Sequence, residues 1–362
     1  MNVDHPAARP FTYVAIGVLG LAAAAAVLIQ PDAARTQTTS GDWEPPLTAH
    51  GHPDLQGNWT NQTLTPFERP EGRGPVLSAD EVAAMEGGQA QTVAERTAPV
   101  DPDRPLPPGG EHRVCIDGAT TCYDEFYREP GERVAIVNGE PRSSLVTDPP
   151  DGRIPDLTPE VRRRLEEAAE FRRGFGQYDH PELRPLAERC IVSFGSSAGP
   201  PMLPNYWYNN SYTIAQNEDF VVIMAEMVHD ARIIPIRDPR EQLESRPEPD
   251  HVTPWFGSSW GHWEDRTLVV ETTNLNPEHA FRGVPPSKDR RVIERFTRVD
   301  EETILYEFTI DDPAVYTSPW GGQVPFKRFD HLLYEYACHE GNYAMFNVLS
   351  GARYQERMGG NP

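Results

Sequence analysis

The chain has 362 residues, with 55 Asp and Glu against 33 Lys and Arg, which gives a formal net charge of −22. Such an acidic surface repels phosphate backbones and anionic lipid headgroups, so nucleic acid is excluded as a partner. The chain holds 37 prolines, about twice the average share of ~5%, and most lie in its first half.

The first 35 residues predict export. Phe11 to Ile29 is an uncharged, Ala- and Val-rich run, long enough to span a bilayer core and preceded by Arg9. It is typical of a signal peptide cleaved near Ala33-Ala34, or of an uncleaved signal anchor. Both alternatives place the rest of the chain in the periplasm or outside the cell, and only an anchor would touch the membrane.

Four cysteines fit an oxidising compartment. Cys115 and Cys122 could close a small loop, which leaves Cys190 to pair with Cys338. We predict these two disulfides, although four cysteines allow three pairings. The spacing does not suit zinc, and no metal ligands are predicted. A catalytic thiol at Cys338 is the alternative.

Residues 36–155 predict a Pro-rich, irregular segment that wraps the fold, with short strands at 113–116 and 133–137. Ser78 to Glu81 is a capping box, which predicts a short helix to about Met85 that could resume after Gly87-Gly88. Residues 156–200 predict a helix and a linker. Here Thr158 is the expected N-cap, Pro159 opens the helix and Gly174 ends it.

From residue 201 to 338 the pattern changes to short strands joined by short polar turns. The expected strands are Tyr212–Ala215, Phe220–Val228, Ala231–Ile236, Ser259–Glu264, Thr267–Asn274, Arg291–Val299, Thr303–Ile310 and Lys327–Cys338. Sequential strands of this number predict a mainly β chain that forms an antiparallel up-and-down barrel of about eight strands. Residues 339–362 predict a C-terminal helix and tail.

Gly57-Asn58-Trp59 resembles the Gly-x-Trp that opens the first strand of lipocalins, and Gly261-His262-Trp263 repeats the triplet. No Arg partner for the Trp is evident. This resemblance implies a calycin-like barrel.

Nearly the whole mature chain resembles a widespread family of exported bacterial proteins of unknown function. The matching stretches are Pro53–Trp59, Ser144–Pro155 (SLVTDPPDGRIP), Glu226–Arg232 (EMVHDAR), Thr267–Asn274 (TLVVETTN) and Tyr334–Tyr343 (YEYACHEGNY). The resemblance implies export and a barrel, and it supplies no activity.

A glutamate lies in the middle of five expected strands. These residues are Glu226, Glu271, Glu294, Glu307 and Glu335. Side chains alternate between the faces of a strand, so the apolar face of Ile304, Tyr306, Phe308 and Ile310 puts Glu307 on the opposite face, and Leu332 and Tyr334 do the same for Glu335. One interpretation is a solvated outer face paired with arginines. The alternative is a lumen lined by carboxylates that raise one another's pKa.

Two short segments place a histidine beside a carboxylate, His229-Asp230 and His339-Glu340. A histidine at a barrel mouth could act as a general base near neutral pH. We predict His229, Asp230, His339 and Glu340 as the catalytic residues if the protein is an enzyme. A structural histidine and a helix cap are the simpler interpretations, and a metal held by both histidines is a further alternative.

The expected ligand-binding residues are polar and aromatic side chains near the strand ends. They are Glu226, Glu271, Asn274, Glu307, Glu335, Asn342, Trp207, Tyr208 and Trp260. Aromatic rings of this kind stack on flat or apolar ligands.

Two functions follow from these patterns. The first is an exported barrel that binds a small, partly apolar molecule. The alternative is a cofactor-free extracytoplasmic hydrolase, lyase or isomerase that uses histidines and carboxylates at the barrel mouth. The sequence names neither the ligand nor a cofactor.

Overall fold

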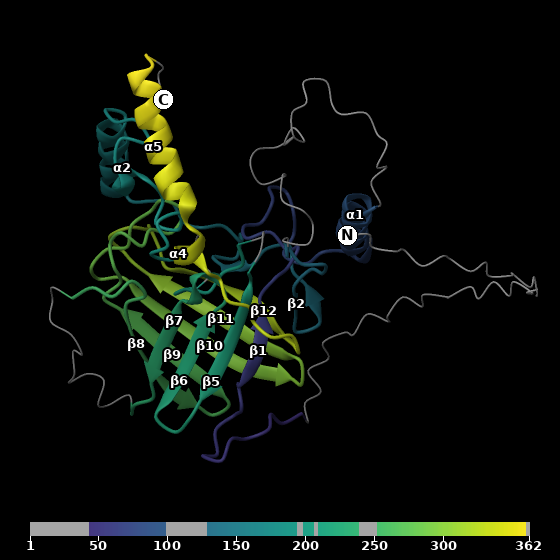
Figure 1. Cartoon of the computed structure of the whole chain (residues 1–362). Coiled ribbons are helices and arrows are strands. Elements are labelled where there is room, and N and C mark those ends of the chain that lie inside the picture. Colours follow the sequence, from purple (N-terminus) through teal and green to yellow (C-terminus); the bar gives the residue numbers. More distant parts are fainter. Residues whose placement is uncertain (1–42, 99–128, 194–197, 206–208, 239–251, 360–362) are drawn as a thin grey trace, which may run out of the picture. The chain divides into compact units, whose positions relative to one another are not determined.

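The computed structural model describes residues 43–98, 129–193, 198–205, 209–238 and 252–359, which are mainly β, as predicted (Figure 1). The predicted export signal (1–35), the strand at 113–116 and the Cys115–Cys122 pair lie outside these residues. Within them, no helix has both the length and the apolarity needed to cross a membrane.

Nine strands of the described chain form an antiparallel path that is nearly closed into a barrel. Their order is β7 (Ala231–Pro235), β6 (Phe220–Ala225), β5 (Ser211–Gln216), β1 (Gly57–Thr60), β12 (Trp320–Phe329), β11 (Thr303–Asp311), β10 (Arg291–Asp300), β9 (Thr267–Thr273) and β8 (Ser258–Glu264). Sequential strands are neighbours from β5 to β7 and from β8 to β12. The predicted up-and-down barrel is therefore confirmed.

The two ends of the path meet at β7 and β8. An odd number of strands cannot close with every neighbouring pair antiparallel, and here Ile236 forms a parallel bridge with Gly261. The N–H of Arg237 donates to the carbonyl of Gly261 at 2.9 Å. A parallel pair needs a long connection, which the chain between Pro235 and Ser258 supplies.

The barrel contains a strand that the sequence pattern did not place in it. The Gly-x-Trp strand β1 pairs with β12 on one side and with β5 on the other. It therefore joins strands β5 to β7 and strands β8 to β12 into one sheet. Residues 57–60 thus belong to the barrel, although they lie in the Pro-rich segment.

The prediction of a last strand at Lys327–Cys338 is wrong, because β12 begins earlier, at Trp320, and ends at Phe329. The start of β12 contains Gly321, Gly322 and Pro325, which are residue types typical of turns, so the sequence pattern does not indicate a strand here. A Cβ on Gly322 would lie 2.3 Å from the carbonyl oxygen of Leu145, so glycine allows β4 (Val146–Asp148) to approach closely. The pairing with β4 lies before Pro325 and the pairing with β1 after it, so the missing N–H of this proline faces neither.

The barrel interior is filled by side chains. The apolar face of β11 (Ile304, Tyr306, Phe308 and Ile310) is buried, which decides between the two faces that the sequence left open. Aromatic rings pack across the interior, with ring centroids 5.1 Å apart for Tyr306 and Phe326 and 5.5 Å apart for Tyr212 and Phe326. The described lumen is a packed core.

The Trp of the Gly-x-Trp strand has an arginine partner. The guanidinium of Arg298, on β10, lies 5.6 Å from the centre of the Trp59 ring, and the indole N–H donates to the carbonyl of Leu55. Arg298 also donates to the carbonyls of Asp54 and Glu301, both at the same end of the barrel. The contact joins strands far apart in sequence, which is why the sequence did not reveal it.

Short strands and helices add to the barrel. β2 (Ile136–Val137) and β3 (Glu140–Pro141) form a hairpin near the predicted strand at 133–137. The capping box of Ser78 and Glu81 is confirmed, but α1 (Ala79–Thr97) continues through Gly87-Gly88 without a break. α2 (Pro159–Arg172) begins after its predicted N-cap, Thr158.

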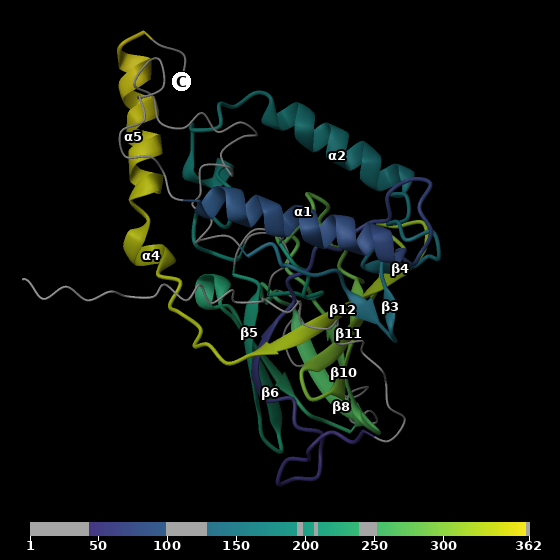
Figure 2. The same ribbon diagram turned by 90° about the vertical axis from the view of Figure 1, so that its right-hand side faces the viewer.

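The C-terminal helix α5 (Tyr343–Arg357) follows the short α4 (Cys338–Gly341), close to the predicted Tyr343–Arg353. Figure 1 and Figure 2 show α1, α2 and α5 beyond one end of the strands. This is the helical end of the barrel.

Candidate functional site

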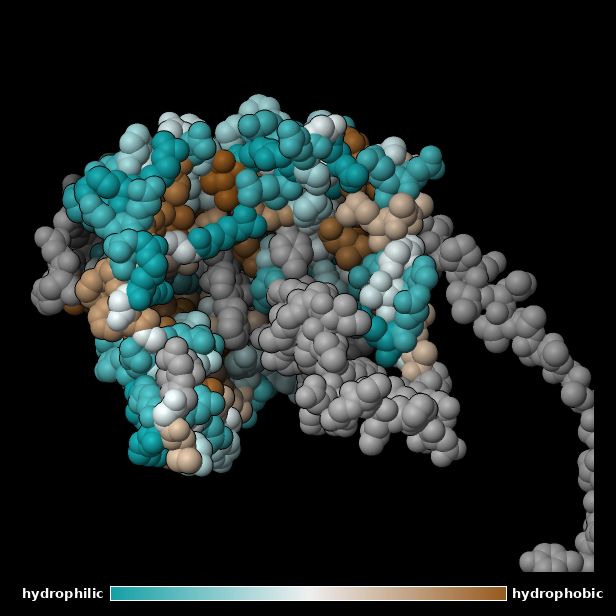
Figure 3. Space-filling view, turned by 90° about the horizontal axis from the view of Figure 1, so that it is seen from above, coloured by the Kyte–Doolittle hydropathy of each residue, from teal (hydrophilic) through white to brown (hydrophobic). Residues whose placement is uncertain are grey.

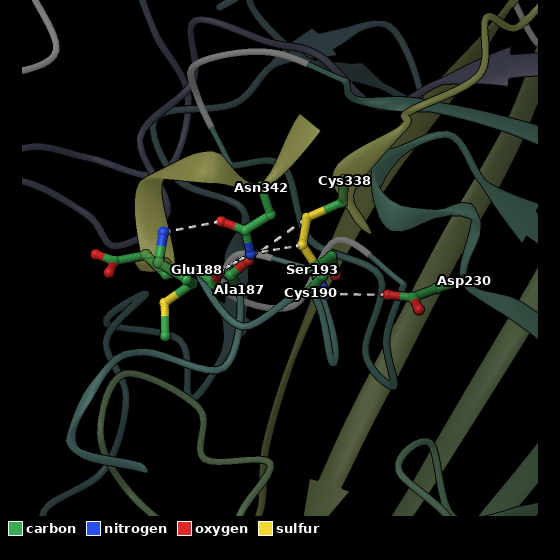
Figure 4. Close-up of a disulfide and its surroundings, with 8 residues drawn as sticks. Ala187, Glu188, Cys190, Ser193, Asp230, Cys338 and Asn342 are labelled. Carbon is green, nitrogen blue, oxygen red and sulfur yellow. Dashed lines mark hydrogen bonds between the residues drawn. A yellow bond between two sulfur atoms is a disulfide. The ribbon is translucent and has the colours of Figure 1, made fainter. Parts of the chain in front are cut away.

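The segments with the predicted catalytic pairs converge at the helical end. The predicted disulfide Cys190–Cys338 is present and ties the start of α4 to residues 187–190 (Figure 4). The amide of Asn342 donates to the carbonyl of Glu188 at 2.7 Å. The N–H of Ser193 donates to the carboxylate of Asp230 at 2.9 Å. Residues 187–193, which we call the disulfide segment, therefore link the two predicted pairs.

The turn after β6 carries the first pair. Glu226 follows the end of this strand, and Met227–His229 form a 3-10 turn in which Val228 and His229 have φ of 60° and 53°. Glu226 and Asp230 are buried, whereas His229 between them is exposed. Burial raises the pKa of Asp230 to about 6, whereas the hydrogen bond from the Ser193 N–H and the charge of His229 act to lower it.

The second pair lies in α4, where both His339 and Glu340 are exposed. The two histidines thus lie on segments that approach each other, with both residues facing solvent. Their predicted role as a catalytic pair stays a prediction.

The five glutamates have different surroundings. Glu271 and Glu307 are half-buried on the outer face, where Glu307 accepts a hydrogen bond from Gln323 and Glu271 lies 3.9 Å from Arg291. Glu335 is exposed and lies after β12, outside any strand, as do the exposed Leu332 and Tyr334. The outer-face interpretation therefore fits Glu271 and Glu307.

Glu294 points into the barrel, where it is completely buried. Two N–H groups of Arg232, on β7, bond to its two carboxylate oxygens. The hydroxyl of Tyr306 donates to the same carboxylate at 2.8 Å and accepts the N–H of Met202 at 2.8 Å. Burial and the charge of Glu294 raise the pKa of Tyr306, which keeps this hydroxyl protonated.

A tight loop closes the barrel over this ion pair. Met202 is completely buried, and Gly199 has φ of +78°. A Cβ on Gly199 would lie 2.8 Å from Cγ of Met202 and 3.1 Å from Nη1 of Arg232, so only glycine fits. The Arg232–Glu294 pair is thus sealed from solvent.

The remaining predicted ligand-binding residues do not form one cluster. Trp207 and Tyr208 lie outside the described residues. Trp260 is half-buried on β8, and the amide of Asn274 donates to the carbonyl of Val252. Asn342 caps α5 and supports the disulfide segment. Of the predicted set, Glu226 lines one of two cavities described next.

The larger of the two is a groove of about 900 Å³ between α2 with Phe175, residues 182–193 and residues 277–285, which we call the α2 groove. Leu165, Phe171, Leu183 and Val192 are among its apolar lining residues. Seen from the helical end, hydrophobic residues are visible between ridges of hydrophilic ones (Figure 3).

Charged groups also line the α2 groove. Arg184 pairs with Glu188, whereas Arg172 and Arg189 form no ion pair within the described residues. Glu182 and Glu278 add negative charge at exposed positions. Sequence reasoning missed this groove, because its walls come from three segments without a shared motif.

The smaller cavity, of about 230 Å³, lies beside Glu226 and is lined by the ends of β1, β5 and β12, by Glu129 and by residues 331–334. We call it the Glu226 cavity. The described residues contain no group of three or more His, Cys, Asp or Glu that could hold a metal ion.

Comparisons with protein-family models, with curated proteins and with solved structures find no match in any of the three. The resemblance to a family of exported bacterial proteins therefore stays a prediction.

Proposed function

We propose that this protein acts outside the cytoplasm as a binding protein for a small, partly apolar molecule, and that the ligand occupies the α2 groove. The observation that carries this proposal is the groove's size and lining. Its volume of about 900 Å³ falls within the ~300–1,000 Å³ of small-molecule sites, and such sites combine apolar walls with a few polar groups.

The charges of the groove favour a ligand with an acidic group. Arg172 and Arg189 have no ion-pair partner in the described part of the chain, and a guanidinium binds a carboxylate with two parallel hydrogen bonds. Phe171 and Phe175 supply aromatic surface at the α2 side of the groove, and both are exposed for large aromatic residues, at 73% and 46%. A medium-chain carboxylate combines these features.

The filled barrel interior supports the groove as the site. In lipocalin-like barrels the lumen is the obvious place for a ligand, but here aromatic side chains occupy it. The enzyme alternative has less support, because His229 and His339 line neither the α2 groove nor the Glu226 cavity.

Calorimetric titration with octanoate tests the proposal, with octanol as the uncharged comparison. Phe175→Ser should weaken octanoate binding about tenfold, because burial of apolar ligand surface is lost. Phe220→Ser is the matched control, since Phe220 is similarly exposed, at 41%, and lies outside the groove.

Two arginine variants on α2 test whether the positive charge at the groove contributes to octanoate binding. Arg172→Gln should weaken octanoate binding and leave octanol binding unchanged, whereas Arg162→Gln, an exposed residue outside the groove lining, should change neither. Equal octanoate affinity for the wild type, Phe175→Ser and Phe220→Ser would refute the α2 groove as the site.

A further inference from the structure

The Glu226 cavity has a feature that the proposed function does not use, a buried carboxylate with almost no partner. Glu226 is only 9% exposed. Its Oε1 accepts one long hydrogen bond, 3.4 Å from the N–H of Tyr334, and its Oε2 accepts none from the described residues. None of the described cationic side chains lies within ion-pair distance of it.

This arrangement is costly without a ligand. A buried carboxylate loses its hydration, and proteins normally compensate with a cation or with several hydrogen bonds. The two carboxylates with at most 1% of their surface exposed follow this rule, since Glu294 pairs with Arg232 and Asp312 pairs with Arg290. Glu226 differs from them in facing a cavity of about 230 Å³.

A second carboxylate lines the same cavity. Burial raises the pKa of Glu129. The negative charge of the nearby Glu226 raises it further. Two like charges that repel each other across a cavity attract a cation placed between them.

The other lining residues indicate the kind of cation. Apolar side chains come from Phe329, Leu332 and Leu333, and the remaining lining residues are Thr60, Ser211, Gln62, His331 and Tyr334. A divalent metal prefers a shell of oxygen ligands, whereas an alkylammonium ion uses both carboxylates and apolar wall. An aliphatic amine stays protonated at neutral pH, with an ordinary pKa near ~10.4.

We propose that the Glu226 cavity binds a small primary alkylammonium ion, with the charged nitrogen between Glu226 and Glu129 and the alkyl chain against Phe329 and Leu333. This site is separate from the α2 groove, with which it shares no lining residue. The protein would then hold a cationic ligand at a different place from the partly apolar one.

Calorimetric titration of the full-length chain with n-butylammonium at pH 8 tests this site, with n-butanol as the neutral comparison. We expect n-butylammonium to bind at least tenfold more tightly than n-butanol. Glu226→Gln should weaken n-butylammonium binding at least tenfold. Glu307→Gln is the matched control, because this glutamate lies on the outer face of the barrel, and it should bind as the wild type does.

Failure of n-butylammonium to bind the wild type, equal binding of n-butanol, or unchanged binding by Glu226→Gln would each overturn the proposal. Tighter binding of Ca²⁺ than of n-butylammonium would also overturn it, in favour of a metal site. If circular dichroism shows that Glu226→Gln does not fold, Glu129→Gln replaces it, with at least threefold weaker binding expected and unchanged binding refuting the site. Phe175→Ser should leave n-butylammonium binding intact, so this proposal and the α2 groove can fail separately.

Discussion

Removing the arginine of the buried ion pair should be one of the most destabilising single changes in the barrel. In Arg232→Met the Glu294 carboxylate, with no exposed surface, keeps only the hydroxyl of Tyr306 as a partner. Breaking a buried pair from one side typically costs about 3–5 kcal/mol, because the remaining charge is uncompensated. We expect the free energy of unfolding to fall by that amount.

The double variant Arg232→Met/Glu294→Gln separates charge from packing. Its Gln can still accept from Tyr306, and its amide can donate to Ser259 or Thr272, whose hydroxyls lie 3.4 Å from Nη2 of Arg232. It should therefore recover at least about 1.5 kcal/mol of the loss, since the stranded charge is gone.

Urea unfolding with the disulfide intact measures both effects. The matched control is Arg295→Met. Arg295 follows Glu294 on β10 and forms an exposed ion pair with Glu264 on β8, so its loss should cost less than about 1 kcal/mol. A loss below about 1 kcal/mol for Arg232→Met, or a double variant no more stable than the single one, would refute a sealed ion pair.

Three further predictions concern stability. The raised pKa of Asp230, about 6, means that the folded state holds this proton more tightly than the unfolded state does, so its contribution to stability is present below about pH 4 and is lost as the pH rises through 6. Asp230→Asn should thus raise the free energy of unfolding at pH 8 by up to about 3 kcal/mol and change it little at pH 3.5; parallel stability curves would contradict this. Cys190→Ser/Cys338→Ser should lower the thermal midpoint, with a loss of about 2–5 kcal/mol, and a free Cys338 in non-reducing peptide maps of the wild type would rule out the disulfide. Ser78→Ala should cost the N-cap of α1 about 1 kcal/mol, seen as faster amide hydrogen exchange in its first turns, and unchanged exchange would argue against the capping box.

The barrel could be predicted because its strands alternate regularly and follow one another closely. β11 is the clearest case, where every second residue from Ile304 to Ile310 is apolar and buried. β12 was misplaced, since Gly321, Gly322 and Pro325 are turn residues by type. They suit this strand for two reasons: β4 approaches the glycines closely, and neither β4 nor β1 pairs with the N–H position of the proline. Both reasons depend on contacts with distant parts of the chain, which no local pattern encodes.

The Cys190–Cys338 disulfide beside the candidate site could be predicted from the sequence, whereas the roles of the site residues stay a prediction. The disulfide followed from cysteine counting, and the approach of the two His-carboxylate segments was expected from the barrel, whose strands end together; the structure links them through the disulfide and the hydrogen bond from the Ser193 N–H to Asp230. The direction of each side chain did not follow from the sequence, because a 3-10 turn with two left-handed residues exposes His229 and buries Glu226 and Asp230. The partner of Trp59 and the inward Glu294 depended on contacts between distant strands, and no local pattern encodes those.

We propose that the α2 groove, and not the barrel lumen, holds a small, partly apolar ligand. Determining the structure of the full-length chain with octanoate bound tests this directly. We expect the alkyl chain to lie against Phe171, Phe175 and Leu183, with the carboxylate at Arg172 or Arg189. Octanoate inside the barrel, between Tyr306 and Phe326, or an α2 groove left empty at saturating octanoate, would contradict it.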